Sequence, residues 1–388
     1  MTRVDRRTQV PGFFQRQYLR LTGRWRRASD HADGETVDQR LDFSDVSLTH
    51  LGPSPADTPL TRAPLPPEDP RFIARDAARQ AIEHAHAAWQ DGRPRLIALT
   101  GPSGCGLSTL LNQIPHWFAD GTTTLRVDLP CRPGTASEAL ARITEGFDLP
   151  PTGDALDDAV ACLMAQTPRL ILVDNGHYLY SRLMGNNNGI RALQGLMVAT
   201  QGHHLWLLAC EAQAWRRQCD AVSTDRYFDD IIALDYLTRN ELASLIAARC
   251  PAPSADTDAA PPMDDEQLDT LFKTSHGHPG LALHLAERAL STDAVRIPAP
   301  FDESPLRALE RTELLALAEI SAHGVLTAAD LQSIFRRDSQ GINILLHHLH
   351  QCSLIAAEPR DGADPGYRLQ PLLAPVINAH LVRANYLY

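Results

Sequence analysis

The sequence predicts an α/β fold: a parallel sheet covered by helices on both faces, then a helical lid and a smaller domain in which helices precede a hairpin. Three observations predict this fold. Between residues 96 and 235, short apolar segments alternate with segments of helical periodicity, which is typical of a parallel sheet. A glycine-rich loop follows the first apolar segment. Helical patterns and a second break at residues 297–305 follow the last one.

Composition limits the protein class. The chain has 388 residues, of which 44% are hydrophobic, enough for two or three cores. No stretch approaches the roughly 18 to 20 apolar residues of a membrane span, and the N terminus lacks the apolar run of a signal peptide, so we expect a cytoplasmic protein. The seven cysteines form no CxxC pair, which suits reduced thiols rather than zinc or disulfides.

Residues 1–27 form a basic aromatic tail, in which eight arginines stand against the single acid Asp5. Phe13, Phe14, Tyr18 and Trp25 interleave with these arginines. Peripheral contact with a membrane surface, binding to nucleic acid or to an acidic partner, and a plain disordered tail all fit this pattern. The net charge of -11 argues only against the whole chain coating nucleic acid.

Residues 28–69 are acidic and rich in proline, which predicts a linker. Residues 70–235 then read as a nucleotide-binding core that opens with a helix over 73–89. Its predicted strands are 96–100, 124–128, 170–174, 205–210 and 231–234. Its predicted helices are 108–118, 137–146, 156–166, 189–200 and 212–219.

Residues 236–296 predict a helical lid, with helices at 239–249, 265–275 and 280–290. Residues 301–388 predict a winged-helix domain, because helical patterns at 306–321, 327–335 and 341–352 precede two short strands, 353–357 and 367–370. A last helix is expected within 372–388.

The glycine-rich loop has the spacing of a phosphate-binding P-loop, G-x-x-x-x-G-K-[ST], except that Leu107 stands where lysine belongs. Its backbone N–H groups and the helix that follows predict an anion site. Ser108 is the predicted Mg²⁺ ligand. Without the lysine we expect weakened binding of ATP or ADP. The predicted nucleotide-binding residues here are Gly101, Pro102, Ser103, Gly104, Cys105, Gly106, Leu107, Ser108 and Thr109.

The predicted strand 170–174 ends in Asp174, as a Walker B element does, so this carboxylate is a predicted catalytic residue and Mg²⁺ ligand. Asn175 follows, where many such enzymes have a glutamate that activates water. An amide cannot accept that proton, which predicts slow or absent hydrolysis.

These motifs resemble the AAA+ and related STAND ATPases, in particular those that end in a winged helix, over roughly residues 70–388. The resemblance implies a sensor at Ala209-Cys210-Glu211, although the usual Asn or Thr is missing. It implies an arginine finger at Arg226, which would reach the nucleotide of a neighbouring subunit in a homo-oligomer; an ordinary surface arginine is the alternative. It also implies that Pro279, in the turn Gly277-His278-Pro279, lies near adenine; helix-entry geometry alone also explains this proline.

Two functions are open. The first is a regulatory protein that binds ATP or ADP weakly and acts as a switch or scaffold for a protein partner. The predicted winged-helix segment 341–352 has no Arg or Lys, which favours a protein partner over DNA. The alternative is an active ATPase that supports a DNA transaction such as transposition, with the winged helix on DNA. A pure scaffold with a vestigial pocket is a third possibility.

Overall fold

The computed structural model describes residues 60–387, apart from 119–120, 151–155, 181, 183–186, 251–262, 291–300, 302 and 361–362. The predicted basic aromatic tail and residues 28–59 of the predicted linker lie outside the described residues. Among the described residues, no helix is both long and apolar enough to cross a membrane.

A five-stranded parallel sheet forms the centre of the core. Its strands are β1 (Leu96–Gly101), β2 (Thr124–Asp128), β3 (Leu170–Asp174), β4 (Leu205–Glu211) and β5 (Asp230–Ala233), in the spatial order β2-β3-β4-β1-β5. All residues of β1 and β3 are buried, as expected for strands covered on both faces. The parallel register brings Gly101 beside Glu211 and Asp128 beside Asp174, so the loops of the site start from neighbouring strand ends. The predicted α/β P-loop fold is confirmed.

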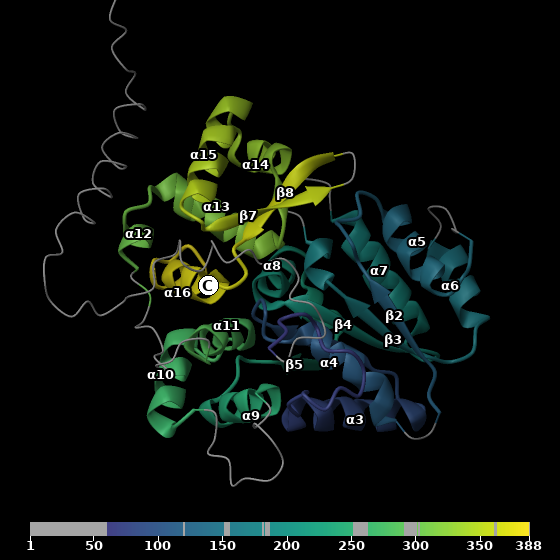
Figure 1. Ribbon diagram of the computed structural model, residues 1–388. Helices are drawn as coiled ribbons and strands as arrows, with labels where there is room; N and C mark the ends of the chain where they lie inside the picture. Colours follow the sequence, from purple (N-terminus) through teal and green to yellow (C-terminus); the bar gives the residue numbers. More distant parts are fainter. Residues whose placement is uncertain are drawn as a thin grey trace, which may run out of the picture. The chain divides into compact units, whose positions relative to one another are not determined.

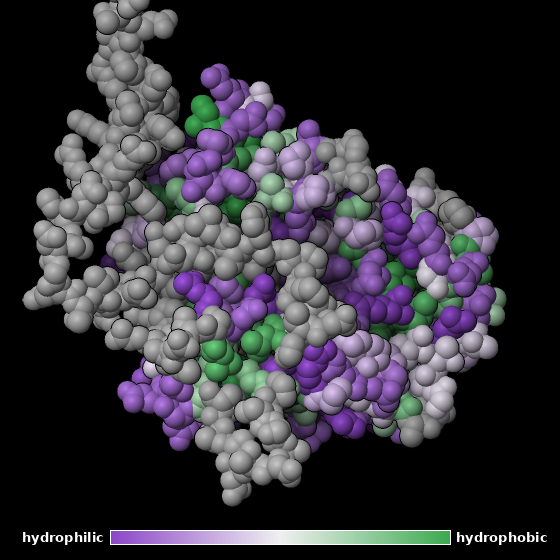
Figure 2. Space-filling model, in the orientation of Figure 1, coloured by the Kyte–Doolittle hydropathy of each residue, from purple (hydrophilic) through white to green (hydrophobic). Residues whose placement is uncertain are grey.

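Helices cover both faces of this sheet (Figure 1). One hydrophobic cluster joins the sheet to α5 (Ala136–Gly146), α6 (Leu156–Met164), α7 (Asn188–Thr200) and α8 (Ala212–Val222). A second cluster joins its other face to α3 (Asp76–Gln90) and α4 (Leu107–Gln113). Hydrophilic atoms predominate on the visible outer surface of α5 and α6 (Figure 2), which fits their amphipathic pattern.

The lid consists of α9 (Arg239–Arg249), α10 (Asp265–Ser275) and α11 (Pro279–Leu290). The helices of the C-terminal domain are α12 (Ser304–Arg307), α13 (Arg311–His323), α14 (Ala328–Phe335), α15 (Ser339–Gln351) and α16 (Ala374–Arg383). Its strands are β6 (Leu326–Thr327), β7 (Ile355–Arg360) and β8 (Ala363–Leu369), which form a sheet in the order β6-β8-β7. This is a winged-helix arrangement. A single hydrophobic cluster runs through the lid and this domain, so the two pack as neighbours.

The structure departs from the predicted elements at three places, two helices and one short strand that was not predicted, each for a local reason. The predicted helix 108–118 is α-helical only to Gln113 and continues as a 3₁₀ turn, η1 (Ile114–Trp117), because Pro115 has no N–H to donate. The predicted helix 306–321 is divided, since Glu310 forms a capping box with Glu313 and starts α13 anew. Strand β6 has only two residues, too few to show any periodicity.

Thr238 caps α9, and its removal gives a measurable stability prediction. Its hydroxyl accepts a hydrogen bond from the Glu241 N–H, while the Glu241 carboxylate accepts one from the Thr238 N–H. We expect Thr238→Ala to lower the free energy of unfolding by about 1 kcal/mol. Urea denaturation measures this change. Ser244→Ala, at an exposed position inside the same helix, is the matched control and should leave the midpoint nearly unchanged.

Candidate functional site

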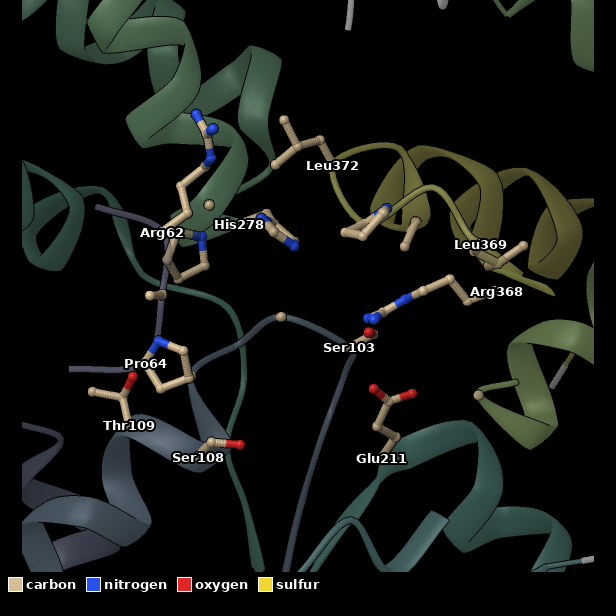
Figure 3. Close-up of a pocket in the computed structure, with 18 of the residues that line it drawn as sticks. Arg62, Pro64, Ser103, Ser108, Thr109, Glu211, His278, Arg368, Leu369 and Leu372 are labelled. Atoms are coloured by element: carbon tan, nitrogen blue, oxygen red, sulfur yellow. The ribbon is translucent and has the colours of Figure 1, made fainter. Parts of the chain in front are cut away.

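A cavity of about 580 Å³ lies where the P-loop, the lid, the winged-helix domain and residues 61–64 meet. This volume is within the range of small-molecule sites. Figure 3 shows the arrangement: Ser108 and Thr109 lie on one side, Leu369 and Leu372 of the C-terminal domain lie opposite, and His278 projects between them.

The P-loop takes the backbone conformation that its glycines permit. Gly104 and Gly106 have φ of 76° and 105°, in the region that disfavours side chains. The N–H of Cys105 donates to Pro102 O and closes the turn. The N terminus of α4 has no capping side chain, so its first N–H groups remain available to a ligand.

The predicted loop residues divide into two groups. The cavity is lined by Ser103, Gly104, Gly106, Leu107, Ser108 and Thr109. Gly101, Pro102 and Cys105 do not line it. Cys105 is buried, and this burial raises the pKa of its thiol to about 12, so the side chain supports the loop and is not a reactive thiolate.

The C-terminal domain contributes a cationic side chain to the cavity. Arg368, on β8, lines the cavity and pairs with Glu358 of β7 at 2.5 Å. Figure 3 shows its guanidinium pointing toward Ser103 and toward the carboxylate of Glu211. Glu211 ends β4, so the expected sensor position does face the cavity, with a carboxylate in place of Asn or Thr.

Asp174 and Asn175 lie at the end of β3 and line, with Ser108, a smaller cavity of about 170 Å³ that shares Gly104, Gly106 and Ser108 with the first. The Asp174 carboxylate is 5% exposed and pairs with Arg126 of β2 at 2.7 Å. Asn175 has φ 60° and ψ 35°, the left-handed conformation in which Asn is favoured over most residues. A backbone preference therefore explains the amide at this position, and a glutamate here would be strained.

The lid contributes His278 and Pro279 to the cavity wall. The Nδ1 of His278 accepts a hydrogen bond from the Leu281 N–H, so the neutral ring carries its proton on Nε2. This Nε2 is buried beside Gly104 and has no hydrogen-bond partner among the described residues. A buried donor without a partner next to a P-loop is available to a ligand.

Arg226 takes no part in the cavity of its own chain. It lies exposed on the short turn η3 (Thr224–Tyr227). An exposed position is compatible with the predicted finger, whose role requires a second subunit and stays a prediction.

Residues of the predicted linker cross α4 near the P-loop. The Leu65 N–H donates to Thr109 Oγ1, and Asn112 Nδ2 donates to Leu65 O at 2.7 Å. Arg62 points away from the loop toward α11 (Figure 3), where it bonds His284 and Glu287. Residues 61–68 therefore connect the P-loop helix with the lid.

The C-terminal domain contacts the core directly. The Arg182 N–H donates to His323 Nε2 at 3.2 Å, and the Arg182 side chain pairs with Glu319. The rings of Tyr180 and His323 lie 4.7 Å apart. These contacts join α13 to the segment that follows β3.

Sequence patterns did not identify four arginines of this region: Arg62, Arg126, Arg249 and Arg368. Arg62 and Arg368 lie in a proline-rich segment and a hairpin, far from any motif in the chain. Arg249, whose Nη1 donates to Thr61 O, belongs to an ordinary helical pattern. Arg126 alone carried a weak signal, since a charged residue is unexpected inside a strand of a covered parallel sheet.

Residues 90–217 match a family model described as an AAA domain. No match was found among curated proteins. Solved structures with a similar fold include the Aeropyrum pernix ORC1 protein in complex with DNA, at 12% identity and a TM-score of 0.46, covering 89% of this chain and 100% of that one. The Aeropyrum pernix ORC2 protein with ADPNP and ADP is 15% identical, with a TM-score of 0.45, and the match covers 81% of this chain and 95% of that one. Cdc6p from Pyrobaculum aerophilum is 14% identical, with a TM-score of 0.42, and the match covers 81% of this chain and 97% of that one.

Proposed function

We propose that the chain binds ADP or ATP in the cavity at the P-loop, hydrolyses ATP slowly or not at all, and acts as a nucleotide-dependent switch or scaffold for a protein partner. One observation carries this proposal. A P-loop forms one wall of a cavity of about 580 Å³, and the lid and winged-helix domain close the opposite side. The AAA domain match over residues 90–217 supports a nucleotide as the ligand.

The donors around the cavity suit a polyphosphate although Leu107 replaces the lysine. Backbone N–H groups of the loop, the unpartnered Nε2–H of His278 and the guanidinium of Arg368 come from three different domains. A nucleotide that engages all three would favour the closed arrangement of lid and winged helix. It shifts that balance by its difference in affinity for the closed and open arrangements.

Hydrolysis is expected to be impaired because the cavity has no group placed as a general base at position 175. The amide of Asn175 cannot accept the proton of an attacking water. Glu211 also lines the cavity, where Figure 3 shows its carboxylate facing the guanidinium of Arg368.

Calorimetry with ADP and with ATP, combined with a phosphate-release assay, tests the proposal on the full chain. Binding without turnover supports it. If neither nucleotide binds the natural chain but Leu107→Lys restores binding, the pocket is vestigial and the protein is a scaffold only. Ready turnover of ATP contradicts the proposal.

Arg368 provides a prediction that involves the winged-helix domain. We expect Arg368→Gln to weaken ADP binding about tenfold, because a charge-assisted hydrogen bond contributes about 1.5–3 kcal/mol. The matched control is Arg383→Gln on α16, since Arg383 also pairs with a glutamate, Glu303, at 2.5 Å. Arg383 does not line the cavity, so its loss should leave the dissociation constant unchanged. Equal effects of the two variants would contradict a role for Arg368.

A protein partner for the winged helix is supported by the surface of α15. This helix contains no Arg or Lys, and Ile344 on it is 54% exposed. Hydrophobic atoms are visible among hydrophilic ones in this region (Figure 2). A helix that seats in a DNA groove generally presents cationic side chains to phosphates, which α15 lacks.

The second candidate function is an active ATPase that supports a DNA transaction such as transposition. Retention of Asp174 at the end of β3, within the match to an AAA domain, favours it. Phosphate release in the presence of duplex DNA, abolished by Asp174→Ala, would establish this function instead.

A further inference from the structure

The carboxylate of Asp174 is already engaged on both oxygens. Its Oδ1 accepts the N–H of Asn175 at 2.7 Å, and its Oδ2 pairs with Nη2 of Arg126 at 2.7 Å. This is the position from which P-loop proteins hold Mg²⁺.

Arg126 is also held by a group on its own strand and by one on α4. Its Nε and Nη2 donate to Asp128 Oδ1 at 3.0 and 2.9 Å, and its Nη1 donates to Asn112 Oδ1. Asn112 lies on α4, one turn beyond Ser108. The guanidinium therefore lies between the P-loop helix and the ends of β2 and β3, held by three side chains.

These residues do not fit a Mg²⁺ site. The guanidinium offsets the charge of the Asp174 carboxylate, which lies with Ser108 at the end of β3, and a dication placed against it would face a fixed positive charge. Mg²⁺ also demands oxygen ligands in near-ideal octahedral geometry. Among the described residues, no group of three or more His, Cys, Asp or Glu could hold a metal ion.

We propose that this chain binds nucleoside di- or triphosphates without a divalent cation, and that Arg126 takes the electrostatic place of the metal. Because Asp174 lines the cavity, its bare charge would repel a phosphate. The ion pair with Arg126 neutralises this charge whether or not Mg²⁺ is present, because the guanidinium is part of the protein. The inference rests on the proposed function, since it concerns how the same cavity accepts its ligand.

Calorimetry of ADP binding to the unmodified full chain, in Mg²⁺ and in EDTA, is the first test. We expect the two dissociation constants to agree within about twofold. A loss of affinity of about tenfold or more in EDTA would overturn the proposal. This comparison needs no variant and is therefore independent of any effect on folding.

Arg126→Gln removes the charge and keeps a polar side chain with an N–H donor. In EDTA we expect this variant to bind ADP about tenfold more weakly than the natural chain, and Mg²⁺ to restore the lost affinity. The matched control is Arg142→Gln, which removes an exposed arginine paired with Glu145 on α5 and should bind ADP equally with and without Mg²⁺. If Arg126→Gln binds ADP as tightly as the natural chain does, both in EDTA and in Mg²⁺, the proposed role of Arg126 is contradicted.

Mn²⁺ alone, followed by electron paramagnetic resonance, separates failure of the inference from failure of the proposed function. We expect the natural chain to bind no Mn²⁺ through Asp174, so Asp174→Asn should leave its Mn²⁺ signal unchanged. Arg126→Gln should gain a bound Mn²⁺ that a second substitution, Asp174→Asn, removes. Mn²⁺ held by the natural chain through Asp174, or no gain in Arg126→Gln, overturns the inference. If ADP binds under neither condition, the proposed function fails and the Mn²⁺ result alone decides the question.

Discussion

Leu107→Lys should tighten the binding of ADP and ATP about tenfold to a hundredfold. A lysine at this position would reach the outer phosphates, and a charge-assisted hydrogen bond contributes about 1.5–3 kcal/mol. Leu107 begins α4 and lines the cavity beside Ser108, so the new side chain would start at the correct position. Calorimetry on the natural chain and the variant measures the change.

Leu107→Met is the matched control, because it replaces one apolar side chain with another of similar volume and adds no charge. It should bind nucleotide as the natural chain does. Phosphate release should stay slow in Leu107→Lys, since Asn175 is unchanged. Unaltered affinity in the lysine variant would mean that Arg368 and His278 already supply all the stabilisation the phosphates can receive, or that the phosphates lie elsewhere.

The sheet and most helices could be predicted because their signals are local. Each strand of the core is a short apolar segment between turns, and β2 and β3 have the predicted bounds. Lid helices α9 and α10 also begin and end as predicted, because each starts at a residue that forms a capping box, Thr238 or Asp264. Elements without periodicity were missed, as β6 shows.

The candidate site could be predicted only where one segment carries it. The P-loop and Asp174 belong to motifs of fixed spacing, so the sequence places them near one another. Arg368 enters the cavity through the packing of β8 against the core, more than 250 residues from the P-loop. No spacing rule relates the two. For the same reason the pairing of Arg126 with Asp174 becomes visible only when β2 and β3 lie side by side.

The cavity depends on how the lid and winged helix pack together. Because one hydrophobic cluster runs through both, they are expected to move as one body rather than separately. The winged helix also packs on the core, through α13 against α8 and through polar contacts that include His323. We expect a charge on His323 to weaken this junction between the winged helix and the core.

Acidification from pH 6.5 to pH 4 should unfold or open the protein cooperatively. Burial lowers the pKa of His278, His284 and His323 from 6.5 to about 4 in each case. Unfolded histidines bind protons near pH 6.5 whereas the folded ones resist until about pH 4. The stability from their neutral forms is thus present above pH 6.5 and lost as the pH falls toward 4, up to about 3 kcal/mol for each histidine.

The junction between core and winged helix should take part in this response. His323 donates from Nδ1 to Glu319 O and accepts the Arg182 N–H at Nε2, so protonation of Nε2 abolishes the second bond. Thermal unfolding by circular dichroism at several pH values, for the natural chain and His323→Gln, measures the effect. The variant cannot titrate at this position and should lose less stability on acidification. The control His84→Gln changes an exposed histidine on α3, and its melting temperature should depend on pH as that of the natural chain does. A melting temperature of the natural chain that stays constant between pH 6.5 and 4 would contradict a role for these buried histidines.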